Sequence, residues 1–261
     1  MTTDMLEHRY GENVIVFDSL HLNTLLTELS SKDTFQPQIN RIVRRLYSSL
    51  FSLILDRENG DKNVTVDTRM ATFTPKGTLQ TKVLDDQARW VIVDLARAGM
   101  IPAEVCFDEA NEVLDPTRSR IDHIFINRKV DENEQVIGTD VSGNKIGGDV
   151  EDALLLFPDP MGATGSSIAD AIGIYRDQVE GTPRKVICVH LIITPEYLRR
   201  ITTDFPDVAV YALRVDRGLS EEEVLATIPG ERWDEEKGLN ERHYIVPGAG
   251  GLGEIINNSF V

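Results

Sequence analysis

Residues 153–167 read ALLLFPDPMGATGSS. The stretch begins with an uninterrupted apolar run, which is typical of a strand buried on both faces of a parallel sheet. It then passes through small residues into a helical pattern of apolar positions at Ile168, Ile172 and Tyr175. A strand, a tight loop and a helix in this order predict one unit of an α/β fold, in which ligands bind beyond the carboxyl ends of the strands.

Other short apolar runs repeat this alternation along the chain. Runs that predict strands lie at 13–17, 91–95, 121–127, 186–193 and 208–213. Apolar residues at helical spacing separate several of them, most clearly over 39–50. We therefore expect an α/β fold with a parallel β-sheet flanked by helices, formed by residues 1–261 as one domain.

Composition excludes several classes of protein. The formal net charge of −16 disfavours nucleic acid as a partner, because like charges repel. Cys106 and Cys188 lie far apart without CxxC spacing, so neither a disulfide framework nor a zinc site is expected. No run is long and apolar enough for a membrane span, and no signal-peptide pattern is present. These features predict a cytoplasmic protein without a membrane partner.

The loop after the apolar run has the properties of a phosphate cradle. Its candidate ligands are five consecutive residues: Ala163, Thr164, Gly165, Ser166 and Ser167. Small residues let backbone N–H groups approach an anion, and the following helix directs its positive dipole end there. Asp159 is placed to accept hydrogen bonds from sugar hydroxyls. No lysine follows the glycine as in a Walker A loop, and the loop at 157–167 contains no GxGxxG, so the pattern indicates a ribose 5′-phosphate. An ordinary glycine and serine turn is the alternative.

Residues 157–167 resemble the phosphoribosyl pyrophosphate loop of uracil phosphoribosyltransferases, which typically reads VDPMLATGGS. Further segments match that family in the same order: 74–77 (TPKG), 97–100 (RAGM), 126–129 (INRK), 191–196 (LIITPE), 205–211 (FPDVAVY) and 244–248 (YIVPG). The resemblance covers roughly residues 13–258. It implies a type I phosphoribosyltransferase fold and transfer of ribose 5-phosphate from phosphoribosyl pyrophosphate to uracil, giving uridine monophosphate and pyrophosphate in pyrimidine salvage.

The resemblance also assigns roles to residues outside the cradle. Asp159 and Arg97 are the catalytic candidates, with Asp159 on the ribose hydroxyls and Arg97 on the pyrophosphate. A cis peptide bond is expected between Ala96 and Arg97. Arg128 is a second pyrophosphate candidate, or else only a solvated side chain. Mg²⁺ is expected to arrive with phosphoribosyl pyrophosphate, and no metal ligand is assigned to the chain.

Uracil selection in the family relies mostly on backbone groups of the tail. The corresponding positions are Tyr244, Ile245 and Gly250, with Leu252 placed to pack on the base. A hood near 239–258 and a protruding β-arm near 122–149 complete the expected architecture. Because the family's enzymes usually pair through their arm, the resemblance predicts a homodimer.

The sequence departs from the family pattern at several positions. Gly251 stands where the family has an aspartate, Glu254 replaces a second one, and Gly162 and Ser166 alter the cradle. Residues near 219–238 are inserted. These changes leave two alternatives: the same chemistry on another base, or a catalytically weak homologue that senses nucleotides.

Overall fold

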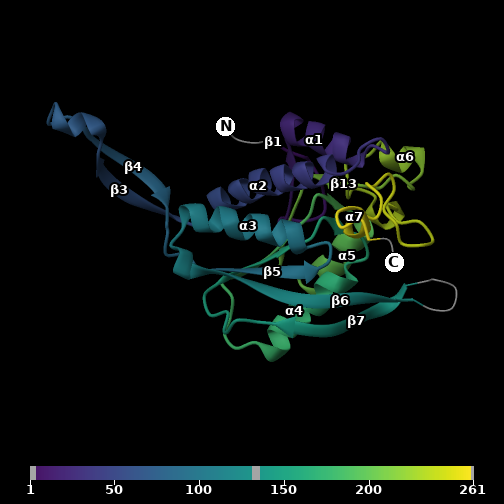
Figure 1. Ribbon diagram of the computed structural model, residues 1–261. Helices are drawn as coiled ribbons and strands as arrows, with labels where there is room; N and C mark the ends of the chain where they lie inside the picture. Colours follow the sequence, from purple (N-terminus) through teal and green to yellow (C-terminus); the bar gives the residue numbers. More distant parts are fainter. Residues whose placement is uncertain (1–3, 131–135, 260–261) are drawn as a thin grey trace.

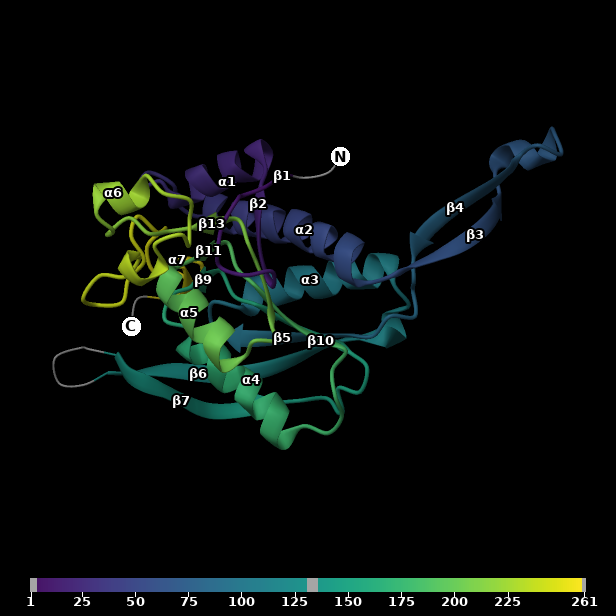
Figure 2. The same ribbon diagram turned by 180° about the vertical axis from the view of Figure 1, so that it is seen from behind.

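The computed structural model describes residues 4–130 and 136–259. Within these residues the main sheet has the strand order β1-β2-β12-β10-β8-β5-β6-β7. Figures 1 and 2 label several of its strands, among them β1, β5, β6 and β7. Its strands are β1 (Asp4–Met5), β2 (Val14–Asp18), β5 (Trp90–Ala96), β6 (Ser119–Val130), β7 (Val136–Lys145), β8 (Leu154–Pro158), β10 (Lys185–Val189) and β12 (Ala209–Ala212). Neighbours from β2 to β6 pair in parallel, and β1 and β7 add antiparallel edges. The predicted parallel sheet is confirmed.

Central strands of this sheet are covered on both faces. All five residues of β8 are buried, as are six of the seven residues of β5. Because both faces of such a strand avoid water, its sequence is a continuous apolar run instead of an alternation. This is why the runs at 91–95 and 153–157 identify the sheet so directly.

Helices cover the two faces of the sheet. They are α1 (Leu20–Ser30), α2 (Gln38–Glu58) and α3 (Met100–Val113) on one face, and α4 (Ser166–Gln178) and α5 (Pro195–Asp204) on the other. On the first face Phe51 meets Trp90 edge to face, with ring centroids 5.2 Å apart. On the second face Phe157 meets Tyr175 in the same way at 5.7 Å. Each face therefore has its own apolar core, and together they hold the sheet rigidly.

Two hairpins differ from the single arm that the sequence predicts. The hairpin near 122–149 exists as β6 and β7, but it forms an edge of the main sheet. The hairpin that projects from the body is β3 (Asp61–Asp67) with β4 (Thr78–Leu84), with the short helix η1 (Arg69–Thr72) at its tip (Figures 1 and 2). Its strands pair only with each other, and no residue of either strand is fully buried.

A small second sheet lies beyond the carboxyl ends of the main strands. It consists of β9 (Met161–Gly162), β11 (Ile192–Ile193) and β13 (Arg214–Val215), each of which shortly follows a main-sheet strand. The remaining short helices are η2 (Pro116–Arg118), α6 (Glu222–Leu225), η3 (Trp233–Glu235) and α7 (Leu252–Ile255). This second sheet connects the cradle, the start of α5 and the C-terminal tail.

The 219–238 insertion is folded against the body. Arg217 donates to the buried Glu236 at 2.8 Å and to the carbonyls of Val224 and Thr227. The Trp233 indole N–H donates to the carbonyl of Pro195 at 3.0 Å. The insertion therefore braces the start of α5. In the described ranges, none of the helices has both the length and the apolar character that a membrane span requires.

Candidate active site

The loop after β8 passes through a narrow space beside α5. Gly162 has no room for a side chain, because a Cβ there would lie 2.9 Å from Ile193 and 3.0 Å from the ring of Tyr197. Gly165 adopts a left-handed φ of 78° as the N-cap of α4. The Thr194 hydroxyl donates to the Ala163 carbonyl at 2.7 Å. These contacts fix the loop at the start of α4.

Hydrogen-bond donors collect at this helix start. The Oγ atoms of Thr164 and Ser166 lie 3.1 Å apart. The backbone N–H groups of Thr164, Gly165 and Ser167 donate to no acceptor in the described parts of the chain. Free amides at the first turn of a 13-residue helix, together with the helix dipole, favour an anion. The five predicted cradle residues thus lie together at the start of α4, and their binding of a phosphate stays a prediction.

Arg200 is a cradle residue that sequence reasoning missed. From α5 its Nη1 donates to the Ser166 Oγ at 2.8 Å, and its Cδ lies 3.4 Å from where a Gly165 Cβ would stand. This guanidinium brings positive charge to a site in an acidic chain, where an anionic ligand needs it. The sequence signal was weak, because an arginine on an amphipathic helix usually faces solvent.

The buried side chain of His190 fixes the start of the loop after β8. Its Nδ1 lies 2.6 Å from the carbonyl oxygen of Asp159, and its Nε2 lies 2.6 Å from the Tyr197 hydroxyl. Because a carbonyl only accepts, Nδ1 carries the proton and the tyrosine donates to Nε2. Complete burial lowers the pKa of His190 to about 4. The histidine is therefore a neutral structural link that fixes the backbone of Asp159, whose carboxylate is partly exposed.

Arg97 directly follows β5, at the same end of the sheet as the cradle. The peptide bond between Ala96 and Arg97 is cis, as the resemblance implies. Gly99 packs closely enough that a Cβ there would lie 3.1 Å from the carbonyl oxygen of Pro158, the last residue of β8. The Arg97 side chain is exposed, and its Nη1 donates to the Ser259 Oγ at 2.6 Å. The loops after β5 and β8 therefore lie against each other.

The predicted base-binding tail lies at the same end of the sheet. A Cβ on Gly253 would lie 3.3 Å from Ala98, so α7 covers the loop that carries Arg97. Ile245 pairs with Leu239 in an isolated antiparallel β-bridge. The hydrogen bonds of this bridge are made by the residues before and after Ile245, and none is made by Ile245 itself. Its own N–H and C=O consequently point away and bond to nothing within the described residues. A free donor and acceptor side by side can recognise the edge of a planar base.

Other predicted tail residues have different surroundings. Tyr244 is 41 % exposed, and Gly250 has a left-handed φ of 74°. Leu252 is 1 % exposed within the apolar core, so its side chain packs inward. The Glu254 carboxylate occupies the space beside Gly251 that a side chain at that position would fill. An acidic group is thus present next to the position where the family's aspartate is missing.

Two features lie outside this arrangement. Arg128 pairs with Thr139 in the β6–β7 hairpin, but its side chain falls outside the described part of the structure.

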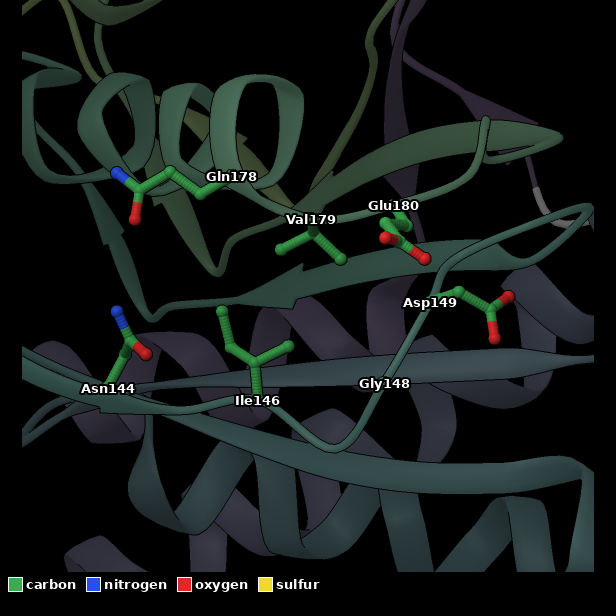
Figure 3. A pocket seen from close by; sticks show the side chains of 7 residues that line it. All are labelled: Asn144, Ile146, Gly148, Asp149, Gln178, Val179 and Glu180. Atoms are coloured by element: carbon green, nitrogen blue, oxygen red, sulfur yellow. The ribbon is translucent and has the colours of Figure 1, made fainter.

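A pocket of about 330 Å³ lies between the end of α4 and the segment after β7 (Figure 3). Its lining includes Gly148, Asp149 and Gln178. These residues precede β8 or end α4, so the pocket is remote from the cradle at the start of that helix.

Comparisons with known proteins agree with this geometry. A family model described as uracil phosphoribosyltransferase matches residues 16–231. A uracil phosphoribosyltransferase of Dictyoglomus thermophilum is 28% identical over 92% of this chain and 97% of its own length. The one from Campylobacter curvus is 32% identical, and the match spans 49% of this chain and only 50% of that relative. The solved structure of the AQ2163 protein from Aquifex aeolicus shares the fold, with a TM-score of 0.68, 20% identity and coverage of 93% and 97%.

Proposed function

This chain belongs to the uracil phosphoribosyltransferase family, and we propose that it transfers ribose 5-phosphate from phosphoribosyl pyrophosphate to uracil in pyrimidine salvage. The observation that carries the proposal is the convergence of three loops at one end of the sheet. They are the cradle at 163–167, the loop with Arg97, and the tail that presents Ile245. A phosphate, a pyrophosphate and a base are the three parts that such a reaction must hold together.

The reaction needs positioning more than covalent chemistry from the protein. N1 of uracil forms a bond to the anomeric carbon as the bond from that carbon to pyrophosphate breaks. The electron pair leaves with pyrophosphate, and the N1 proton is released to solvent. The cradle holds the 5′-phosphate, Asp159 accepts from the ribose hydroxyls, and Arg97 stabilises the charge that grows on the leaving group.

Mg²⁺ fits this site as an ion that enters with phosphoribosyl pyrophosphate. Within residues 4–130 and 136–259, no three His, Cys, Asp or Glu side chains gather to hold a metal. Pyrophosphate oxygens are ligands that Mg²⁺ prefers. When bound, the ion would share with Arg97 the neutralisation of the leaving group, and Arg128 is a second candidate for that role.

We propose that uracil is read by the backbone of the tail. The free N–H and C=O of Ile245 offer one donor and one acceptor, which matches the alternating acceptor and donor groups of a pyrimidine edge. Tyr244 and Gly250 flank this pair. Because backbone atoms supply the contacts, the selection depends on the position of the chain and little on side-chain identity.

We also propose a homodimer in the cytoplasm. The projecting β3–β4 arm carries exposed apolar side chains, and Phe73 at its tip is 81 % exposed. Such a surface on an extended arm fits a second copy of the chain better than solvent. Cys106 and Cys188 are both free and buried, which fits a reducing compartment. Light scattering should give twice the chain mass, and Phe73→Asp should give a monomer.

The test of the reaction is product formation from uracil and phosphoribosyl pyrophosphate with Mg²⁺, with cytosine, hypoxanthine and orotate assayed in parallel. Uridine monophosphate from uracil alone is the expected result. It would also show that Gly251 is tolerated. Product from another base would reassign the substrate. Binding of uridine monophosphate without turnover on any base would instead support the nucleotide sensor.

A further inference from the structure

Hydrogen bonds fix the backbone of the residues that follow Ile245. The N–H of Val246 donates to the Gly238 carbonyl at 2.8 Å, and its carbonyl accepts from the N–H of Gly218 at 3.0 Å. The N–H of Gly248 donates to Asp216 at 2.7 Å, and its carbonyl accepts from Arg214 at 3.0 Å. The tail therefore has little freedom next to the groups proposed to read the base.

Arg214 and Asp216 are the charged side chains that hydrogen-bond to this backbone segment. The Arg214 Nε donates to one carboxylate oxygen at 2.6 Å and its Nη2 to the other at 2.9 Å. Asp216 is 2 % exposed, and Arg214 also reaches the Ser30 hydroxyl at 3.2 Å. A bidentate pair with a buried carboxylate has a defined geometry, so the side chains can fix the glycine that they both contact.

The glycine held by this pair touches the base-reading residue. Gly248 has a left-handed φ of 62°, and the position of its absent Cβ is filled by the carbonyl of Ile245. Any rotation of the Gly248 peptide must therefore move that carbonyl. Recognition through backbone atoms requires their placement to within about 0.5 Å.

We propose that Arg214 and Asp216 are positioning residues for base recognition, acting through Gly248 on the Ile245 backbone. The inference rests on the proposed transfer to uracil. It predicts that the pair controls the affinity for the base, while the 5′-phosphate and pyrophosphate contacts at 163–167 and Arg97 stay unchanged.

The same chain supplies a matched control at the other end of the sheet. Arg120 and Asp122 make a bidentate pair at 3.0 and 3.1 Å, and Asp122 is 1 % exposed. Asp122 accepts from the N–H of Gly147 at 2.9 Å, and Arg120 donates to the carbonyl of Gly148 at 3.0 Å. This pair has the same residue types and spacing, and it likewise binds a glycine N–H and a glycine carbonyl, but it holds the segment before β8. Asp122 also accepts from the Tyr175 hydroxyl at 2.7 Å.

The experiment compares Arg214→Lys and Asp216→Asn with Arg120→Lys and Asp122→Asn. Lysine cannot donate to both carboxylate oxygens and the carbonyl in one plane, and asparagine directs an amide N–H at a donor. For the first pair we expect the KM for uracil to rise about tenfold or more, since hydrogen bonds to charged groups are lost. The KM for phosphoribosyl pyrophosphate and kcat should change less than about twofold, because the pair acts only on the segment that is proposed to read the base.

Hydrogen exchange provides a second readout that does not need turnover. Peptides covering 244–252 should exchange faster in the Arg214 and Asp216 variants and stay at the wild-type rate in the Arg120 and Asp122 variants. An unchanged uracil KM with unchanged exchange would overturn the positioning role. Equal losses in all four variants would mean that the pair only stabilises the fold. An inactive wild-type enzyme would instead refute the proposed function itself.

Discussion

The two arginine and aspartate pairs, Arg214 with Asp216 and Arg120 with Asp122, use the same chemistry at opposite ends of the sheet. Each arginine binds both oxygens of a buried aspartate two residues later, and each pair holds a glycine-containing segment by its backbone. Arg120 lies at the start of β6, whereas Arg214 begins β13 beyond the main strands. The two pairs hold different segments, and Asp122 also accepts from the buried Tyr175 hydroxyl at 2.7 Å.

Position in an α/β sheet therefore determines what a contact does. At the amino ends of the strands the held parts are the connection into β8 and Tyr175 near the end of α4, so we expect them to contribute to stability alone. At the carboxyl ends the held segment belongs to the tail whose helix α7 packs on the loop that carries Arg97. Activity should consequently respond to changes at one end and remain insensitive to equally disruptive changes at the other.

The largest expected effect comes from the two arginines that flank β5. Arg97 follows the strand, and Arg97→Ala should lower kcat by roughly 10²–10³, as for loss of one donor to developing charge. Arg89 precedes the strand and binds Asp149 at 2.6 Å, so Arg89→Ala should lower the melting temperature and leave kcat unchanged. Steady-state kinetics and thermal unfolding of both variants check this. Wild-type turnover by a folded Arg97→Ala enzyme would remove Arg97 from the site.

A titration at the carboxyl end sharpens the comparison. The pKa of buried His190 is lowered to about 4, so between roughly pH 6.5 and 4 the unfolded chain binds a proton that the native protein does not. The contribution of neutral His190 to the free energy of unfolding is complete above pH 6.5. It should decrease by about 3 kcal/mol as the pH drops from 6.5 to 4.

Urea unfolding across this pH range measures the effect. His190→Asn should flatten the slope, since asparagine does not titrate. Parallel slopes for wild type and His190→Asn would show that other groups dominate acid unfolding.

The parts of the fold that could be predicted are those whose signal is contiguous in sequence. The run at 153–157 identifies β8 because both of its faces are buried, and residues 163–167 identify the cradle because small residues and a helix start follow each other directly. The cis bond before Arg97 followed from the family resemblance. Local patterns of this kind need no knowledge of the tertiary arrangement.

The parts that could not be predicted depend on pairing between distant segments. Arg200 contributes to the cradle from 34 positions away, and Asp216 binds Gly248 from 32 positions away. The β3–β4 arm was missed because neither face of the hairpin is covered, so its pattern lacks the burial that marks a strand. Leu252 looked suited to a base, yet the core of the protein covers its side chain.

Two glycines around α4 test how tightly the cradle is built. Gly162→Ala would force a methyl group to within 3.0 Å of Ile193 and Tyr197, which should cost about 1–3 kcal/mol and displace the loop. We expect a higher KM for phosphoribosyl pyrophosphate. Gly173→Ala meets nothing within 4 Å inside α4, so it should stabilise the protein by about 0.5–1 kcal/mol with unchanged kinetics. If Gly162→Ala behaved like Gly173→Ala, the close contact with α5 would not matter for the site.

The smallest expected effect belongs to a third bidentate pair. Arg184 binds both oxygens of Asp152 at 3.0 and 2.8 Å, with the same fork geometry as the two buried pairs. The Asp152 side chain is 71 % exposed, so water solvates the carboxylate in either state and the pair orders no backbone segment through it. Arg184→Ala should therefore shift the melting temperature by less than about 1 °C and leave all kinetic constants unchanged. A loss comparable to that of Arg120→Lys would mean that bidentate geometry alone stabilises the protein. The expected near-zero result would assign the effect to burial of the aspartate and to the backbone groups that it holds.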